Sequence, residues 1–268
     1  KQFREEISPY FNANPKKYIS ALVSEDCWQA TPGKVVDLVR NLGIAAGGTV
    51  MEDCRVLEAC REGKYTSVLV QTHDKKYVEY RTEHFVNALG SGAGKLCDSM
   101  GIDAGLYPVR HQAFITRRLP MLGKHGTNLD MLIDRQDYKG FSAVYGQQIA
   151  YTGQIIGCAS PKLDAMRIDK NLKVNTKAFL EIVSEMFSEW IPDLAGVGIQ
   201  AVWAGYYTEP RYIVDPELGL FVGMRGHGFM LSQYIARMYV DKLLGRPVPE
   251  YFEKLKLNGP GLSEKAFK

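Results

Sequence analysis

A glycine-rich turn near the end of the sequence has residue types and spacing that could bind a ligand. Residues 219–230 read Gly-Leu-Phe-Val-Gly-Met-Arg-Gly-His-Gly-Phe-Met. Residues 229–244 then carry apolar residues at helical spacing, and Gly245 and Pro247 predict the end of that helix. A glycine turn at a helix start exposes main-chain N–H groups at the positive end of the helix dipole. The pattern predicts either a site for a phosphate or another electron-rich group, or a tight turn without a ligand.

Two features beside this turn could add chemistry. His227 lies between two glycines at the predicted helix start, which makes it a candidate active-site residue. Residues 203–211 (Trp-Ala-Gly-Tyr-Tyr-Thr-Glu-Pro-Arg) concentrate aromatic side chains and one arginine. Arginine can bind a carboxylate through two parallel hydrogen bonds, and aromatic walls suit a small ligand. The same composition is also typical of an aromatic core strand with a solvated Arg211, so both interpretations stay open.

Other catalytic motifs are incomplete or absent from the sequence. Leu89 stands where a P-loop needs its first glycine, and Leu96 follows Lys95 in place of serine or threonine. The chain has no G-x-G-x-x-G fingerprint, no closely spaced histidine pair and no Gly-x-Ser-x-Gly elbow. We therefore expect no P-loop nucleotide hydrolysis, no metal site and no serine-hydrolase chemistry.

Composition limits the protein class further. The 268 residues are 46% hydrophobic, enough for one large or two smaller domains, and the net charge of +3 does not favour nucleic-acid binding. No run of 18 apolar residues predicts a membrane span. The five cysteines are scattered without a Cys-x-x-Cys motif, which favours reduced thiols in a cytoplasmic protein.

The elements that must position these residues follow from periodicity and turn signals. A helix is predicted from Thr31-Pro32 to Gly43. A second helix is predicted over 93–100, at the end of the glycine-rich run 90–94. Strands are predicted at 54–59, 66–72, 76–81 and 83–89, the second and third forming a hairpin. From Pro108 the runs 109–116, 128–134, 141–145, 148–152 and 154–158 predict an antiparallel sheet. An amphipathic helix is predicted at 175–190, and further extended segments at 197–205 and 211–214.

Five of these segments, taken in order, resemble the D-amino-acid oxidase-like family of FAD-dependent amine oxidoreductases, which includes sarcosine oxidase, glycine oxidase and dimethylglycine dehydrogenase. The matching segments are 31–43, 84–93, 107–116, 203–215 and 219–230. The resemblance implies a mixed α/β fold. It consists of a three-layer FAD-binding domain of the GR2 type (residues 1–107 and 196–268) and an inserted antiparallel, β-rich substrate domain (residues 108–195).

The resemblance also implies roles for individual residues. For binding of FAD it points to Val56 on the adenine side, to Asn87, Ala88 and Gly90 near the pyrophosphate, and to Gly226, Gly228, Phe229 and Met230 against the isoalloxazine and ribityl chain. For catalysis it points to His227, Arg211 and Tyr207, and for substrate binding to Tyr206, Trp203 and Arg225. Arg211 departs from the family pattern, because many relatives have aspartate there.

The implied activity is oxidation of a small amino acid or N-alkyl amino acid, with hydride transfer from the C–H next to nitrogen to flavin N5 and hydrolysis of the resulting imine. Family members begin with a strand and a G-x-G-x-x-G turn that this sequence lacks. We therefore expect a partner chain or a missing N-terminal segment to supply that motif. Two alternatives are a non-catalytic subunit or remnant of such a flavoprotein, and a flavin dehydrogenase subunit that passes electrons to a partner.

Overall fold

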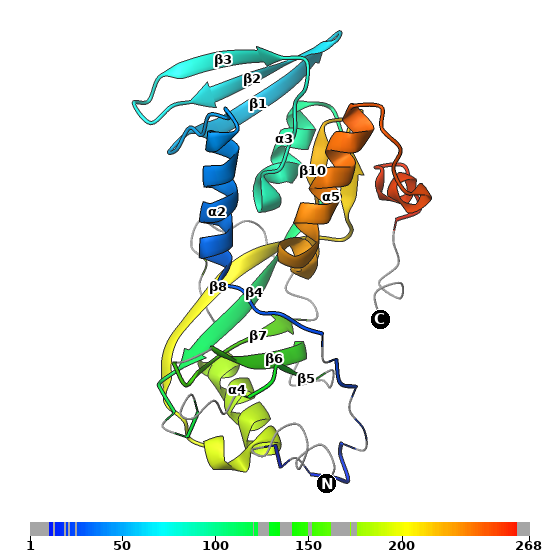
Figure 1. Ribbon diagram of the computed structural model, residues 1–268. Helices are drawn as coiled ribbons and strands as arrows, with labels where there is room; N and C mark the ends of the chain where they lie inside the picture. The colour runs from blue at the N-terminus through cyan, green and yellow to red at the C-terminus, as the bar shows by residue number, and fades with distance from the viewer. Residues whose placement is uncertain are drawn as a thin grey trace. The chain divides into compact units, whose positions relative to one another are not determined.

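The computed structural model divides the chain into two compact units (Figure 1). Unit 1 comprises residues 1–25 and 109–206, and unit 2 comprises residues 26–108 and 207–268. The structure describes residues 11–12, 14–18, 20, 22–24, 26–119, 121–122, 129–134, 141–149, 152–161, 172 and 176–261. The fold is mixed α/β with antiparallel sheets. Which unit holds a cofactor and which a substrate stays a prediction.

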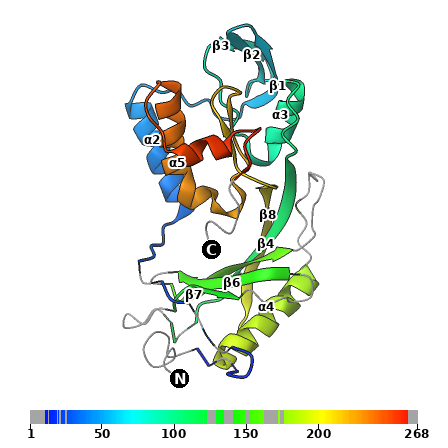
Figure 2. The same ribbon diagram turned by 90° about the vertical axis from the view of Figure 1, so that its right-hand side faces the viewer.

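Unit 1 is built on a five-stranded sheet of order β5-β6-β7-β4-β8. The bounds are β4 Tyr107–Thr116, β5 Leu132–Asp134, β6 Phe141–Ile149, β7 Gln154–Pro161 and β8 Ile199–Glu209. The β5–β6, β6–β7 and β7–β4 pairs run antiparallel, as the sequence predicts. Helix α4 (Thr176–Trp190) lies against one face of this sheet (Figures 1 and 2) and is followed by the short helix η2 (Pro192–Leu194).

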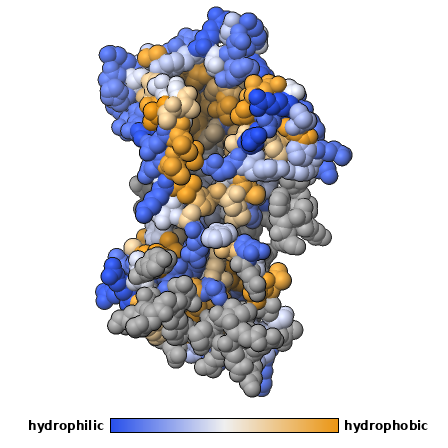
Figure 3. Space-filling model, in the orientation of Figure 1, coloured by the Kyte–Doolittle hydropathy of each residue, from blue (hydrophilic) through white to orange (hydrophobic). Residues whose placement is uncertain are grey.

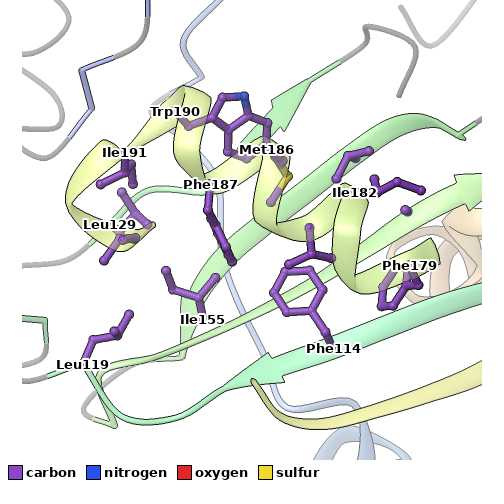
Figure 4. Close-up of a cluster of buried hydrophobic side chains, with 14 of the residues drawn as sticks. Phe114, Leu119, Leu129, Ile155, Phe179, Ile182, Met186, Phe187, Trp190 and Ile191 are labelled. Carbon is purple, nitrogen blue, oxygen red and sulfur yellow. The ribbon is translucent and has the colours of Figure 1, made fainter. Parts of the chain in front are cut away.

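The core of unit 1 forms between α4 and the sheet (Figure 4). The Phe114 ring of β4 meets Phe187 edge-on at 5.5 Å and Phe179 at 6.0 Å between ring centroids. A Cβ at Gly157 would lie 2.4 Å from the Phe114 ring, so this position of β7 requires glycine. The apolar face predicted for residues 175–190 is confirmed, because its members, including Ile182 and Met186, are fully buried.

A polar cluster attaches the N-terminal segment to unit 1. The buried Asp134 carboxylate accepts hydrogen bonds from Tyr18 Oη at 2.7 Å and from Trp190 Nε1 at 3.0 Å. The N–H of Asn12 donates to the Trp190 carbonyl at 2.9 Å, and Lys17 forms an ion pair with Glu189. These contacts provide hydrogen-bond donors to the buried carboxylate and hold Asn12, Lys17 and Tyr18 at the end of α4.

Unit 2 contains two small sheets and three α-helices within its described residues. Strands β1 (Arg55–Glu62), β2 (Tyr65–Gln71) and β3 (Tyr77–Thr82) form an antiparallel meander, which confirms the predicted hairpin. Its inner face packs on α3 (Ala93–Ser99) through Ala59, Val68, Val70 and Leu96. The second sheet pairs β9 (Ile213–Asp215) with β10 (Leu220–Val222). Helices α2 (Pro32–Ala45) and α5 (Gly228–Leu243) and the short helix η4 (Glu250–Leu255) complete the unit.

Three predicted elements differ from the structure. Residues 83–89 do not form a strand: Asn87 alone pairs, through an isolated parallel bridge to Leu220. Residues 141–149 form one strand where two were predicted, because Gly146 continues the ladder opposite Gly157 and does not turn. Helix α2 begins at Pro32 as predicted, after Thr31, but runs two residues past Gly43 to Ala45.

Candidate cofactor-binding site

The candidate site begins with two parallel segments of unit 2. The N–H of Asn87 donates to the Gly219 carbonyl at 2.8 Å, and the N–H of Phe221 donates to the Asn87 carbonyl at 3.0 Å. Each segment continues through glycine residues into a helix, the first through η1 (Gly90–Gly92) into α3 and the second through η3 (Arg225–His227) into α5. The carboxyl ends of parallel segments meet at one edge, which is where open α/β sheets bind ligands.

Asn87 shapes the first turn from inside. Its buried side chain donates from Nδ2 to the Ala93 carbonyl at 3.1 Å, and its Oδ1 accepts from the N–H of Leu89 at 3.3 Å. The exposed Ala88 and Gly90 follow, and a Cβ at Gly90 (φ +55°) would meet nothing within 4 Å. Asn87 therefore positions the turn, while the main chain of residues 88–90 is the part that faces outward.

The second turn needs its glycines for packing. A Cβ at Gly223 (φ +72°) would lie 1.9 Å from the carbonyl oxygen of Arg211, and one at Gly226 would lie 2.8 Å from the Tyr207 ring. A Cβ at Gly228 would lie 2.9 Å from the Cβ of Met224. These contacts place Tyr207 beneath the turn, where its ring sets how closely residue 226 can approach.

Both helix starts are suited to a negatively charged group. Neither α3 nor α5 has a side-chain cap, and neither has an acidic residue in its first turn. The turns η1 and η3 run directly into these helices, so some N–H groups at the starts, such as that of Ala93, already donate to a carbonyl of the turn. The dipole at each start is positive. Phe229 and Met230 in the first turn of α5 are exposed apolar side chains. Main-chain donors beside exposed apolar groups fit a ligand that has both an anionic part and a flat apolar ring.

The side chains at the start of α5 are held by unit 2 itself. Tyr212 Oη lies 2.8 Å from Nδ1 of His227, and burial of Tyr212 fixes the orientation of the imidazole. Arg225 adopts a left-handed backbone (φ +47°), and its Nε donates to Glu209 at 2.5 Å. Glu209 and Tyr212 were not among the residues singled out from the sequence. Their only sequence signal is a position within or next to the aromatic segment.

Arg211 has a contact set that differs from the predicted one. Its guanidinium donates to the main-chain carbonyls of Leu257 and of Gly259, the latter at 2.9 Å. These bonds attach the segment after η4 to unit 2, and the predicted catalytic role of Arg211 stays a prediction. Val56 likewise packs against the cluster of Ala59 and Leu96.

The family model for FAD dependent oxidoreductases (DAO) matches residues 3–242. The chain belongs to this family. Comparison with curated proteins gives no match. The DAO family uses FAD as its cofactor, which agrees with the chemistry of the two helix starts in unit 2.

Several solved structures have a similar fold. The L-proline dehydrogenase from P. horikoshii is 24% identical, with a TM-score of 0.67, and the match covers 84% of this chain and 59% of that chain. The glycine oxidase from Geobacillus kaustophilus is 18% identical, with a TM-score of 0.60 and coverage of 80% and 54%. The iminodiacetate oxidase from Chelativorans sp. BNC1 is 15% identical, with a TM-score of 0.62 and coverage of 85% and 58%. The chain thus spans little more than half the length of these DAO-fold structures.

The predicted site residues of this DAO-family chain fall into both units. His227, Arg225, Tyr207, Gly226, Gly228, Phe229 and Met230 lie at or beneath the second turn of unit 2, and Asn87, Ala88 and Gly90 lie at the first. Trp203, which is exposed, and Tyr206 belong to β8 within unit 1. Whether any of these residues contacts cofactor or substrate stays a prediction.

Three further predictions concern metals, disulfides and membranes. Within the described part of the chain, no group of three or more His, Cys, Asp or Glu side chains could hold a metal ion. None of the five cysteines, all of which the structure describes, forms a disulfide. A search of the described helices finds none with the length and apolar character to cross a membrane.

Proposed function

We propose that this chain forms part of an enzyme that oxidises a small amino acid or N-alkyl amino acid with FAD as the electron acceptor. The observation that carries the proposal is the pair of uncapped helix starts that follow the parallel bridge between Asn87 and Leu220. The names of the structural neighbours agree with this substrate class, since they denote enzymes of proline, glycine and iminodiacetate.

The chain's own residues would bind and orient. The N–H groups at the start of α5 would stabilise negative charge on the edge of the bound ring system, and Phe229 and Met230 would cover its apolar surface. His227, whose imidazole is oriented by Tyr212 at Nδ1, would lie beside the reacting region. Bound FAD would supply the two-electron acceptor, so placement and electrostatics are the protein's contribution.

Arg225 is the stronger candidate for binding a substrate carboxylate, because the donors of Arg211 already serve Leu257 and Gly259. Glu209 pairs with Arg225 and holds its Nε, which fixes where the guanidinium lies and partly neutralises its charge.

The test is flavin reduction by substrate. The full chain is purified with FAD together with the part of the P. horikoshii L-proline dehydrogenase that has no counterpart in this chain. Bleaching of the flavin absorbance is then followed with proline, glycine and N-methylglycine. We expect bleaching with at least one of them, and turnover about tenfold lower in His227→Asn, equivalent to about 1.4 kcal/mol of barrier. A flavin complex that none of these amines reduces would overturn the assignment.

A non-catalytic subunit is the second candidate. The observation in its favour is the partly buried ion pair between Arg225 and Glu209. In this pair Glu209 already neutralises the positive charge of Arg225 that would otherwise attract a substrate carboxylate. Glu209→Gln separates the two: it should tighten substrate binding in an enzyme, measured as a lower KM, and should change nothing in a non-catalytic subunit. Dye reduction compared with oxygen consumption then distinguishes a dehydrogenase subunit from an oxidase. The cytoplasmic location predicted from the cysteine pattern remains part of the proposal.

A further inference from the structure

Tyr212 of unit 2 is a buried residue whose hydroxyl contacts a histidine. Only 5% of Tyr212 is exposed, and its Oη lies 2.8 Å from Nδ1 of His227. The two ring centroids are 6.3 Å apart and the ring planes are tilted by 57°, so the rings are not stacked and the hydroxyl joins them. A buried hydroxyl that finds no acceptor costs free energy, and Nδ1 supplies an acceptor at this distance.

The position of Tyr212 is fixed by its neighbours in unit 2. Its main chain lies between Arg211, whose guanidinium is bonded to the segment after η4, and the buried strand β9. Its ring belongs to the same apolar cluster as Phe252 and Leu255 of η4, both of which are fully buried. Because a closely packed cluster leaves a side chain little room to move, the Tyr212 hydroxyl is held at one point.

His227 lies nearer the surface, at the start of α5. Apolar side chains gather on the surface of unit 2 in this region (Figure 3), among them the exposed Phe229 and Met230. The N–H of His227 donates to the Met224 carbonyl at 3.1 Å, which fixes its main chain. The imidazole still has to adopt one orientation and one tautomer. In a neutral imidazole, the hydrogen bond made by one nitrogen decides which nitrogen carries the proton.

We propose that Tyr212 is a positioning residue whose O–H donates to Nδ1 of His227, which leaves the proton of the neutral imidazole on Nε2. A ring in this state can donate a hydrogen bond to an electron-rich group, and neither nitrogen can take a proton from a substrate amine. The inference rests on the proposed function and deepens it. His227 stabilises negative charge as an uncharged donor and is not the base of the reaction.

The first arm of the test determines the tautomer in the full chain without cofactor. The histidine rings are labelled with ¹⁵N, and a long-range ¹H–¹⁵N correlation spectrum at about pH 8 shows which nitrogen of each ring carries the proton. His227→Asn identifies the signals of His227. We expect one tautomer with the proton on Nε2, whereas the exposed His73 should average between two tautomers. A proton on Nδ1 of His227, or averaging like that of His73, overturns the proposal.

Two buried phenols of the same cluster provide matched variants. Tyr239 is 4% exposed and belongs to the cluster of Tyr212, but its hydroxyl has no hydrogen-bond partner among the described residues. Tyr212→Phe should make His227 average between tautomers as His73 does, and Tyr239→Phe should leave the spectrum unchanged. Each variant keeps its ring and therefore its packing. An unchanged His227 signal in Tyr212→Phe, or an equal change in Tyr239→Phe, overturns the proposal.

The second arm uses the flavin complex of the full chain with the unmatched part of the P. horikoshii L-proline dehydrogenase. With the amine that bleaches it, Tyr212→Phe should slow bleaching at saturating substrate at least threefold and change the substrate Kd less than twofold. Tyr239→Phe should change neither by as much as twofold. The pH dependence of bleaching should keep its shape in His227→Asn, because His227 is not the base. A limb lost in His227→Asn, or an unchanged rate in Tyr212→Phe, overturns the proposal.

The two arms separate this inference from the proposed function. If the spectrum shows the expected tautomer and none of proline, glycine and N-methylglycine bleaches the flavin, the contact of Tyr212 with His227 stands and the redox assignment falls. If an amine bleaches the flavin and His227 carries its proton on Nδ1, the redox assignment stands and the role of Tyr212 is overturned.

Discussion

The contacts of His227 and Arg211 depend on neighbouring residues that the sequence alone does not identify. Both were chosen from the sequence for their chemistry, but Tyr212 orients one at the start of α5 and two distant carbonyls hold the other. The glycines at 223, 226 and 228 could be predicted to form a turn. The packing that requires glycine at 223 and 226 could not be predicted, because the Arg211 carbonyl and the Tyr207 ring come from another segment.

Substitution of Gly223 tests that packing. In Gly223→Ala the new methyl would meet the Arg211 carbonyl in a left-handed backbone (φ +72°), so we expect a loss of about 2–4 kcal/mol in the free energy of unfolding. The matched control is Gly43→Ala in α2, where a Cβ meets nothing within 4 Å. It should be neutral or stabilise by up to about 1 kcal/mol. Equal effects in urea unfolding would contradict the assigned geometry.

His111 of β4 predicts a pH dependence. Burial lowers its pKa from 6.5 to about 4, so between these values the unfolded chain holds a proton that the folded chain does not. The free energy of unfolding therefore rises with pH through this window. The contribution of His111 is fully present above about pH 6.5 and is lost as the pH falls towards 4, a difference of about 3 kcal/mol at most.

The pH dependence is measured as the urea midpoint from pH 4 to 7, followed by the fluorescence of the buried Trp190. His111→Gln should flatten the profile. His73→Gln, in the exposed turn between β2 and β3, is the control and should leave it unchanged. A wild-type slope that survives His111→Gln would refute the assignment to this residue.

Elements with local signals were predicted from the sequence, and elements defined by distant partners were not. The hairpin of β2 and β3 follows from alternation around the His73-Asp74-Lys75 turn, and α2 follows from Thr31 and Pro32. Residues 83–89 have the composition of a buried strand, but a strand exists only through its partners, and the described chain supplies one bridge. The break predicted between residues 145 and 148 is absent, because the pairing of Gly146 with Gly157 that continues the strand is not visible in sequence.

The attachment of η4 is a prediction at the scale of elements. Phe252 and Leu255 are buried against Tyr212 and α5, and Arg211 holds the segment that follows. Arg211→Ala should destabilise this attachment by about 1–3 kcal/mol and speed proteolysis between residues 250 and 261. Arg246→Ala, which removes an exposed ion pair with Asp241, should have little effect. Unchanged cleavage in Arg211→Ala would show that the apolar contacts suffice.

At the scale of the whole molecule, the two units should respond separately to destabilising substitutions in their buried clusters. Met186 is fully buried in unit 1 and Leu220 in unit 2. Each substitution to alanine should cost about 2–5 kcal/mol within its own unit. Hydrogen exchange should accelerate in residues 141–161 and 176–194 for Met186→Ala, and in residues 213–243 for Leu220→Ala. Acceleration of both sets by either variant would show a single cooperative unit.

The family and the mixed α/β class could be predicted because five segments keep their order along the chain. The exact boundaries between the two units could not be predicted from the sequence. The unit boundary falls between Tyr206 and Tyr207, inside β8, whose residues show no change of composition there. Contacts across more than a hundred residues decide such a boundary, and one sequence does not display them.

The contacts of Asn12 and Tyr18 with unit 1 have a practical consequence for preparing fragments of the protein. A fragment excised as residues 109–206 would keep the sheet and α4 but lose Tyr18, and with it a hydrogen-bond donor to the buried Asp134 carboxylate. Supplying residues 11–24 as a separate peptide should rescue such a fragment, since the native tether between the two pieces runs entirely through the other unit.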